Sequence, residues 1–521
     1  MSFKLTYATM FDPPQEMHAR FEAALARVEA GLGATHAFHI DGADVPGRAF
    51  DERRSPADQR LVLGRFPVAD AAAASRALDA AHAAFPAWRR TPPAERARLL
   101  KRAAALIEER VYEIAAALCL EVGKNRMEAL ADAQETADFF TLYADDYLRN
   151  EAFDRALPDD PSGAFRAHNR SVLKPYGAWL VIAPYNFPFA LAGGPVAAAL
   201  ITGNTVVLKG STDTPWAGRL LADVLRDAGV PRGVFNYLSG GGSVAGEALL
   251  AHPHLAGVTF TGSYAVGMHI YRTLANGPYP RPCIAEMGGK NACIVTRNAD
   301  LERAATGIVR SAYGLSGQKC SATSRLYVDE AVADALIEKL LAGIAAIRVG
   351  DPRRREHWMG PVTTAAAYAN YRCYCERLRD GARLLAGARV LDEGDLGHGY
   401  FVAPTLAEAP AAHPLYAEEL FSPILMLCRV RDREEAMHLA NASPLGLTAG
   451  CFGNAEDVEF FFDRIEAGVT YANRAQGATT GAWPGYQPFG GWKGSSSTGK
   501  GIASFYYLAQ YQREQSQTRV E

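Results

Sequence analysis

The chain has 521 residues, of which 49% are hydrophobic and 21% are charged, and its formal net charge is −3. Such a balance is typical of globular protein, and the length predicts two or three domains rather than one core. Charges of both signs are mixed throughout, which argues against a nucleic-acid partner. The sequence contains neither an apolar run of about 18 residues nor a signal-peptide pattern, so we expect no membrane association and a cytoplasmic location.

Helical periodicity dominates the first 150 residues after a mixed start. Residues 1–68 combine short helical and extended patterns. Apolar residues at helical spacing then predict helices over 71–88 and 94–122. A third helix is expected over about 125–150, with most of its acidic residues, Glu128 among them, on a solvated face.

A protruding hairpin is predicted next. A turn at residues 159–163 separates two extended runs, and the second run, 164–174, alternates like a strand. The C-terminal stretch 503–515 also has extended character. We expect it to pair with the 164–174 strand, either within the chain or across a subunit boundary.

From residue 179 onward, short apolar strands alternate with helices. The first group of expected strands is 179–183, 205–208, 234–238 and 257–260, and a second alternating region begins near residue 286. This order is typical of a doubly wound, mostly parallel α/β sheet. Ligands of such sheets bind at the carboxyl ends of the strands, so the loops that follow these strands are the places to search for a site.

Cys320 is the candidate nucleophile. It lies in the small, polar turn Gly317-Gln318-Lys319-Cys320-Ser321. A lysine and backbone N–H groups beside a thiol favour the thiolate, which is the reactive form. Taken alone, the residue is also compatible with one of eight ordinary thiols. The eight cysteines form no disulfide-like framework, and Cys373-x-Cys375 is not completed into a metal site by its neighbours, so no metal is predicted.

Three other loops carry groups that suit carbonyl chemistry. Asn186 follows an expected strand within Pro-Tyr-Asn-Phe-Pro, and its side-chain amide suits the stabilisation of a developing oxyanion. The alternative is that this loop is only a turn. Glu286 is the first residue of Glu-Met-Gly-Gly-Lys, and its carboxylate suits the role of a general base. The alternative is a carboxylate in a surface salt bridge. Lys209 ends a strand beside Ser211 and Thr212, and these side chains suit the binding of ribose hydroxyls or a phosphate. The alternative is that Lys209 is an ordinary surface lysine.

Two glycine-rich turns join a strand to a helix, at residues 239–243 and 260–263. The start of a helix flanked by small residues is a ready anion site, although either segment is equally compatible with a plain turn. The first turn does not have the strict G-x-G-x-x-G spacing of the standard dinucleotide motif.

Together these motifs resemble the aldehyde dehydrogenase superfamily over residues 40 to 515. The resemblance also includes Glu419-Leu-Phe-Ser-Pro423 and Pro488-Phe-Gly-Gly491, all in the family's order. It implies an α/β fold of three parts, namely a Rossmann-type NAD(P)-binding domain, an α/β catalytic domain and a small β oligomerisation hairpin that makes at least a homodimer. The implied ranges are 1–150 and 173–285 for the first part, 286–485 for the second, and 151–172 with 486–521 for the third.

The resemblance also implies roles. Cys320 would attack an aldehyde to give a thiohemiacetal, Asn186 and the Cys320 N–H would hold the oxyanion, and Glu286 would activate the water that hydrolyses the thioester. NAD is the implied cofactor. NADP stays open because Thr212 replaces the glutamate of many NAD-preferring relatives. The implied cofactor contacts are Ile182, Pro184, Tyr185, Lys209, Ser211, Thr212, Gly240, Gly246, Phe260, Thr261, Gly262, Ser263, Met287, Gly288, Glu419 and Phe421.

The loop 480–491 looks like the substrate-anchoring loop of 1-pyrroline-5-carboxylate dehydrogenases, which oxidise L-glutamate γ-semialdehyde. Glu135 is a further candidate, for a substrate amino group. Two departures stand out, since Trp483-Pro484 replaces two aliphatic residues and Ser422 replaces a glycine. Trp483 either narrows the pocket or packs beneath the loop. The implied substrate contacts are Phe187, Ser321, Gly481, Ala482 and Phe489.

Two alternatives accompany this hypothesis. The first is a dehydrogenase of another carboxylated or aromatic semialdehyde, which would need no site for an α-amino acid. The second is a catalytically silent relative that only shares the fold, because fold does not imply function. The joint presence of Cys320, Glu286 and Asn186 argues against the second alternative.

Overall fold

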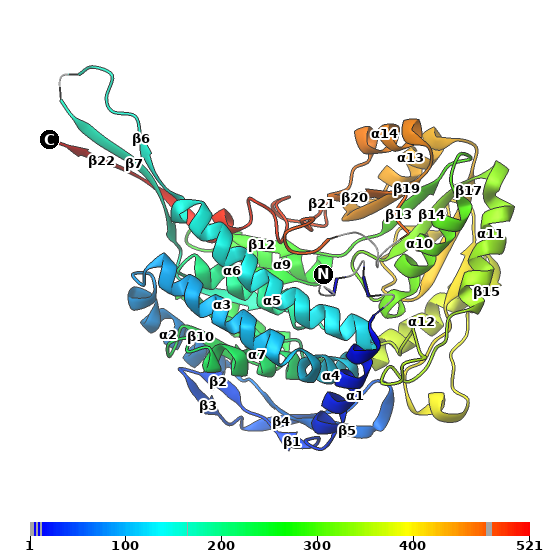
Figure 1. Cartoon of the computed structure of the whole chain (residues 1–521), viewed down its shortest axis with the longest axis horizontal. Coiled ribbons are helices and arrows are strands. Elements are labelled where there is room, and N and C mark those ends of the chain that lie inside the picture. Colours follow the sequence, from blue (N-terminus) through cyan, green and yellow to red (C-terminus); the bar gives the residue numbers. More distant parts are fainter. Residues whose placement is uncertain (1–4, 7–8, 11–12, 164, 476–481) are drawn as a thin grey trace.

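A computed structural model describes residues 5–6, 9–10, 13–163, 165–475 and 482–521. Figure 1 shows two α/β bodies side by side and a narrow β ribbon that projects from the first body. Each body is built around a seven-stranded, mostly parallel sheet. Among the described helices, none is long and apolar enough to cross a membrane.

The first sheet has the strand order β12-β11-β8-β9-β10-β2-β3. The five adjacent strands from β12 to β10 run parallel to one another, and β2 and β3 add an antiparallel edge. The expected strands of the first α/β region are confirmed to within a few residues. The strands are β2 (Phe38–Ile40), β3 (Ala43–Val45), β8 (Ala178–Ile182), β9 (Thr205–Lys209), β10 (Phe235–Leu238), β11 (Leu255–Thr261) and β12 (Cys283–Glu286).

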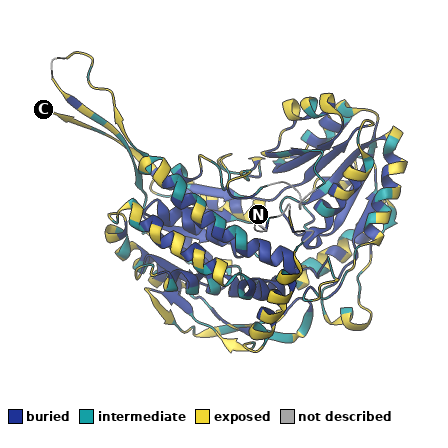
Figure 2. Cartoon of the chain, in the orientation of Figure 1, coloured by how far each residue is buried: buried dark blue, intermediate teal, exposed yellow. Residues whose placement is uncertain are grey.

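Helices cover both faces of this sheet. The apolar side chains of the central strands are fully buried beneath them, as the dark blue strands of Figure 2 show. Between β10 and α8 the chain forms one π-helical turn, Gly242–Gly246. The helices are α2 (Ala71–Trp88), α3 (Pro93–Glu109), α4 (Val111–Val122), α5 (Arg126–Arg149), α6 (Ala190–Ile201), α7 (Pro215–Asp227), α8 (Glu247–Ala251) and α9 (Tyr264–Ala275).

The helix expected over 94–122 is two helices, because Arg110 leaves the helical backbone between α3 and α4. The break allows both segments to pack along α5. The solvated face expected for α5 is wrong in its first half. Glu128 and Asp132 are buried there, because α3, α4 and α6 pack around the helix.

The N-terminal region adds α1 (Gln15–Glu29) and a small sheet of order β1-β5-β4, formed by Ala34–Thr35, Asp58–Val68 and Ala49–Ser55.

The second body contains the sheet β15-β16-β17-β14-β13-β19-β20, in which only β15 is antiparallel to its neighbour. Its strands are β13 (Asn291–Val295), β14 (Thr323–Asp329), β15 (Arg383–Ala386), β16 (Thr405–Glu408), β17 (Ile424–Val430), β19 (Thr448–Phe452) and β20 (Val469–Ala472). Its helices are α10 (Leu301–Tyr313), α11 (Glu330–Ala345), α12 (Ala365–Leu378), α13 (Arg433–Asn441) and α14 (Ala455–Arg464), and a short pair, β18 (Leu445–Gly446) and β21 (Trp492–Lys493), lies beside the sheet.

The projecting ribbon is a three-stranded antiparallel sheet. Its order is β22 (Gln512–Val520), β7 (Ala167–Pro175) and β6 (Asp154–Leu157). The expected pairing with the 164–174 strand is confirmed within one chain from Gln512 onward, in a register that joins Gln512 to Pro175. The extended character expected for the residues before it is wrong, because Leu508–Tyr511 forms a 3-10 turn. Most of the ribbon is exposed, which Figure 2 shows in yellow.

Candidate active site

The three predicted reactive side chains come from both bodies. Glu286 is the last residue of β12, and Asn186 lies in the loop between β8 and α6. Cys320 precedes β14 of the second sheet. The side-chain amide of Asn186 donates a hydrogen bond to the carbonyl oxygen of Gln318, over 2.8 Å. This bond joins the first body to the cysteine turn, two residues before the thiol.

Cys320 lies in a tightly constrained turn. Leu315, Ser316 and Gly317 all have left-handed backbone angles, with φ of 51°, 54° and 67°. A side chain at position 317 would collide with the backbone of Ser422, so only glycine fits there. The hydroxyl of Ser422 donates to the carbonyl of Leu420 over 3.0 Å. The serine that stands where a glycine was expected therefore has a hydrogen-bond partner within its own turn.

The resting cysteine is a thiol. Burial raises its pKa well above the ordinary value, and the nearby charges of Glu286 and Glu419 raise the pKa further. Backbone N–H groups of Ser321 and of Cys320 itself act in the opposite direction, because they donate toward the sulfur and lower its pKa. The expected help from Lys319 is absent, because its ammonium group pairs with Glu128 over 3.1 Å inside the protein.

Glu286 is a buried carboxyl group with an elevated pKa. Burial, followed by the charge of Glu135 on α5, raises its pKa to about 8. Its Oε1 atom is buried and has no hydrogen-bond partner among the described residues. It lines a small cavity together with Thr259 and Tyr507. A carboxylate with an unused oxygen can accept a proton from water, and near pH 8 both of its protonation states are populated.

The predicted cofactor contacts lie at the carboxyl edge of the first sheet. Lys209 is buried at the end of β9, where it donates to the carbonyl of Gly210 over 3.1 Å. Burial lowers the pKa of Lys209 to about 8, although the nearby charge of Asp213 opposes that shift. In the same loop, Thr212 donates to the carbonyl of Gly240 over 3.1 Å, and Ser211 accepts the N–H of Asp213 over 3.2 Å.

Glycines make room for a ligand at this edge. A Cβ atom at Gly242 or Gly246 would meet nothing within 4 Å, so the π-helical turn faces open space. Gly240 has φ of 133° and lies against the backbone of Ala69. Ser263 caps the N-terminus of α9, where its hydroxyl oxygen accepts the N–H of Val266. Open glycine backbone, a helix start and a buried lysine together fit the anionic and ribose parts of a dinucleotide.

Glu419 joins the second body to this edge. Its Oε1 accepts the N–H of Gly289 over 3.0 Å, and it occupies the space where a side chain at Gly288 would lie. Burial raises the pKa of Glu419 to about 7. Phe421 meets the ring of Tyr185 edge to face, with centroids 5.8 Å apart. The other predicted contacts lie on or beside β8, β11 and β12, namely Ile182, Pro184, Phe260, Thr261, Gly262 and Met287.

The predicted substrate contacts are only partly described. Gly481 lies outside the described residues. Ala482 and Ser321 are half-buried, and the Ser321 carbonyl accepts the hydroxyl of Thr448 over 3.2 Å. The backbone N–H of Phe489 donates to the carbonyl of Ile502 over 2.9 Å. Trp483 is buried and belongs to the core beneath the loop, so the packing alternative holds for this residue.

Comparison with known proteins identifies the family. Residues 47–516 match the model of the aldehyde dehydrogenase family. The chain belongs to this family.

Two curated relatives and one solved structure resemble this aldehyde dehydrogenase along its length. A protein of Geobacillus thermodenitrificans called 1-pyrroline-5-carboxylate dehydrogenase is 38% identical over 498 residues, which cover 94% of each chain. A protein of the same name from Bacillus subtilis is 36% identical over 498 residues, again 94% of each chain. The solved structure of a Thermus 1-pyrroline-5-carboxylate dehydrogenase with bound NAD has a TM-score of 0.92, 34% sequence identity and full coverage of both chains. The predicted aldehyde dehydrogenase fold is therefore confirmed.

Sequence reasoning missed a buried charge cluster behind the site of this aldehyde dehydrogenase. Lys124 and Asp132 are fully buried and form an ion pair of 2.8 Å. The Lys124 ammonium lies 3.4 Å from the ring centroid of Phe187, and the other oxygen of Asp132 accepts the N–H of Ala190 at the start of α6. Removing one partner of such a pair costs roughly 3–5 kcal/mol, because the other charge stays buried. The cluster thus fixes Phe187 and the loop that carries Asn186. The nearly continuous apolar sequence of α4, which packs against α5, was the available signal for burial.

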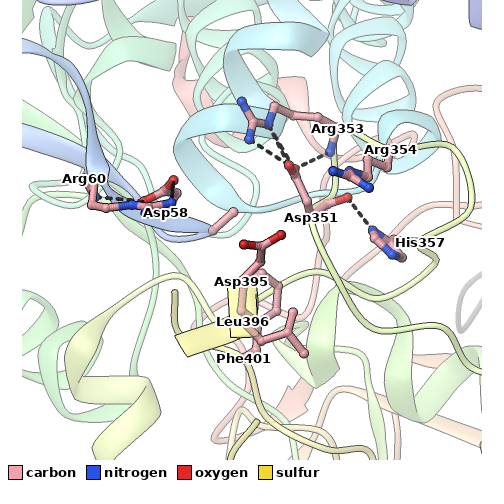
Figure 3. A pocket seen from close by; sticks show the side chains of 10 residues that line it. Asp58, Arg60, Asp351, Arg353, Arg354, His357, Asp395, Leu396 and Phe401 are labelled. Carbon is pink, nitrogen blue, oxygen red and sulfur yellow. Dashed lines mark hydrogen bonds and ion pairs between the residues drawn. The ribbon is translucent and has the colours of Figure 1, made fainter. Parts of the chain in front are cut away.

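A separate hollow lies away from these residues, between β5, the segment 351–357 and residues 395–401. Figure 3 shows that most of its charged side chains pair with one another. Arg60 binds Asp58 and Arg353 binds Asp351, with shortest contacts of 2.8 Å and 2.7 Å. None of the residues predicted for the reaction lines this hollow.

Proposed function

We propose that this aldehyde dehydrogenase oxidises L-glutamate γ-semialdehyde, the open form of 1-pyrroline-5-carboxylate, to L-glutamate with NAD, as in proline breakdown. The observation that carries the reaction type is the junction at the cysteine turn, where the Asn186 amide bonds to the Gln318 carbonyl. That junction brings an amide donor to the turn that carries the thiol, and the charge of Glu286 acts on the Cys320 sulfur. The two named relatives that cover 94% of the chain support the choice of substrate.

The chain's own groups account for the covalent steps. The Cys320 thiol gives its proton to water, the sulfur then attacks the aldehyde carbon, and the resulting oxyanion needs donors that are already in place. Asn186 is held by one hydrogen bond to Gln318, and its amide has a second N–H to offer. The N–H of Cys320 is the second donor. These donors act on a charge that exists only near the transition state, so they raise the rate rather than merely tightening binding.

Glu286 is the base for the second half of the reaction. The thioester on Cys320 is hydrolysed when a carboxylate takes a proton from the attacking water. Glu286 has a buried oxygen without a described partner, and its charge acts on the cysteine sulfur. Because burial raises the pKa of Glu286 to about 8, the ionised base is lost as the pH falls through that value.

NAD would lie along the carboxyl edge of the first sheet, within a cofactor domain of residues 1–150 and 173–285. When bound it accepts the hydride that leaves the substrate carbon. Lys209, Ser263, the glycine turns and Glu419 would hold its ribose and phosphate groups, and Tyr185 and Phe421 would pack beside it. The similar Thermus structure contains bound NAD, so we propose NAD rather than NADP.

We expect the wild-type enzyme to prefer the carboxylated substrate. Measured by cofactor reduction, kcat/KM for glutamate γ-semialdehyde with NAD should exceed that for propanal or benzaldehyde by at least about 100-fold, because a fixed carboxylate site distinguishes these molecules strongly. The same series repeated with NADP tests the cofactor. A higher kcat/KM for a simple aldehyde would contradict the proposed substrate while leaving the reaction type in place.

We also propose that the chain acts as a homodimer or a larger homo-oligomer. The ribbon of β6, β7 and β22 projects from the first body, and its outer strands offer unpaired backbone groups to a second copy. Light scattering should return a mass of at least two 56.1-kDa chains. A monomer at micromolar concentration would contradict this proposal.

A further inference from the structure

Trp483 closes a small turn and inserts its ring into the protein. Only 2% of the residue is exposed. Its backbone N–H donates to the carbonyl of Gln487, and its carbonyl accepts the N–H groups of Tyr486 and Gln487, over 2.9 to 3.2 Å. The segment 483–487 is therefore a closed turn, with the indole as its attachment to the body.

The indole is attached to α5 by a strong hydrogen bond. Its Nε1–H donates to Oδ2 of Asp138 over 2.7 Å. The other oxygen of Asp138 accepts the side-chain amide of Gln134 over 3.0 Å, so the carboxylate itself is held in place. A bond between an N–H and an ionised carboxylate is about twice as strong as a neutral one.

The attachment point lies close to Glu135 along α5. Asp138 lies three residues after Glu135, and residues at that spacing share one face of a helix. The charge of Glu135 acts on Glu286, the predicted base. The indole thus connects the segment 483–487 to the part of α5 that carries Glu135.

We propose that Trp483 and Asp138 are positioning residues that hold the neighbouring backbone of Ala482 where it receives the α-carboxylate of the substrate. This inference rests on the proposed function. Neither side chain has to touch the substrate. Backbone N–H groups are good carboxylate receptors only when their direction is fixed, and small displacements of positioning groups lower affinity strongly. An aliphatic side chain at position 483 would have no N–H to offer Asp138, so the attachment depends on the indole.

The test separates positioning from packing. Trp483→Phe keeps most of the ring volume and removes the N–H, and Asp138→Ala removes the acceptor. Each should raise the KM for glutamate γ-semialdehyde about tenfold, with kcat within about twofold, because the carboxylate contact is the same in the ground and transition states. The KM for propanal, which has no carboxylate, should stay within about twofold of wild type. Asp138→Asn, which keeps an acceptor oxygen but loses the charge, should raise the KM for glutamate γ-semialdehyde less than Asp138→Ala does.

Trp88→Phe is the matched control. Trp88 is equally buried, at 2% exposed, and its Nε1–H donates to the carbonyl of Leu200 over 3.2 Å, away from the loop. Trp88→Phe should leave the KM for glutamate γ-semialdehyde and the KM for propanal unchanged. The double variant Trp483→Phe/Asp138→Ala should be no worse than either single variant, since both remove one bond.

Three outcomes would count against the proposal. Equal rises of KM for both aldehydes, an unchanged KM for the semialdehyde, or additive effects in the double variant would each overturn it. If Trp483→Phe does not fold, Asp138→Ala provides the same comparison. The ratio of kcat/KM for glutamate γ-semialdehyde to kcat/KM for propanal is measured for the wild type in the same series. A wild type without preference would refute the proposed function itself, whereas a preference that Trp483→Phe leaves undiminished refutes only the positioning role.

Discussion

Cys320→Ala is expected to reduce NAD reduction with glutamate γ-semialdehyde by at least about 10⁴-fold. Without the sulfur there is no covalent intermediate, and removal of a nucleophile typically costs several orders of magnitude in kcat. The assay is absorbance of the reduced cofactor. Binding of NAD, followed by calorimetry, should persist, because the predicted cofactor contacts do not include the thiol.

Cys428→Ala serves as the control for this variant. Cys428 is a buried thiol on β17, within the core of the second body. Its loss tests whether any cysteine-to-alanine change in the second body disturbs the enzyme. Turnover by Cys320→Ala above about one hundredth of wild type, with Cys428→Ala fully active, would show that another group performs the attack.

Glu286→Gln is expected to separate the two halves of the reaction. The amide has the same shape as the carboxylic acid but cannot accept a proton, so the thioester on Cys320 should form and then persist. Rapid mixing should show a burst of about one reduced cofactor per site, followed by a steady rate lower by about 10²- to 10⁴-fold. A variant that lost the burst as well would assign Glu286 to the first half of the reaction.

The pH dependence of the wild type follows from the same carboxyl group. Its pKa is raised to about 8, so the proton-accepting form decreases about tenfold per unit below that pH. Where hydrolysis limits turnover, kcat should therefore fall on the acid side of pH 8. Glu286→Gln should lack this acid limb. An acid limb retained by the variant would place the titrating group elsewhere.

The reactive groups were accessible to sequence reasoning because each stands in a fixed local context. The turn around Cys320, the loop of Asn186 and the glycine-rich loop of Glu286 are short motifs whose residue types follow from the chemistry. The ribbon was accessible too, since the alternation of residues 164–174 needs a partner strand. Its partner, β22, is the C-terminal stretch of the same chain.

What the sequence could not reveal depends on packing between distant segments. The acidic residues at the start of α5 look like a solvated face until α3, α4 and α6 surround the helix and bury Glu128 and Asp132. Lys319 adjoins the nucleophile in sequence but directs its charge to Glu128. Trp483 and Asp138 are 345 residues apart, so no local pattern joins them. In each case the partner is fixed by the fold and not by spacing.

The most direct test of the covalent account is the mass of Glu286→Gln after reaction. The variant is mixed with glutamate γ-semialdehyde and NAD, quenched in acid, and analysed whole and as peptides. The account predicts one glutamyl group per chain, attached to the peptide that contains Cys320. An unmodified chain despite a burst of reduced cofactor, or an acyl group on a different cysteine, would contradict it.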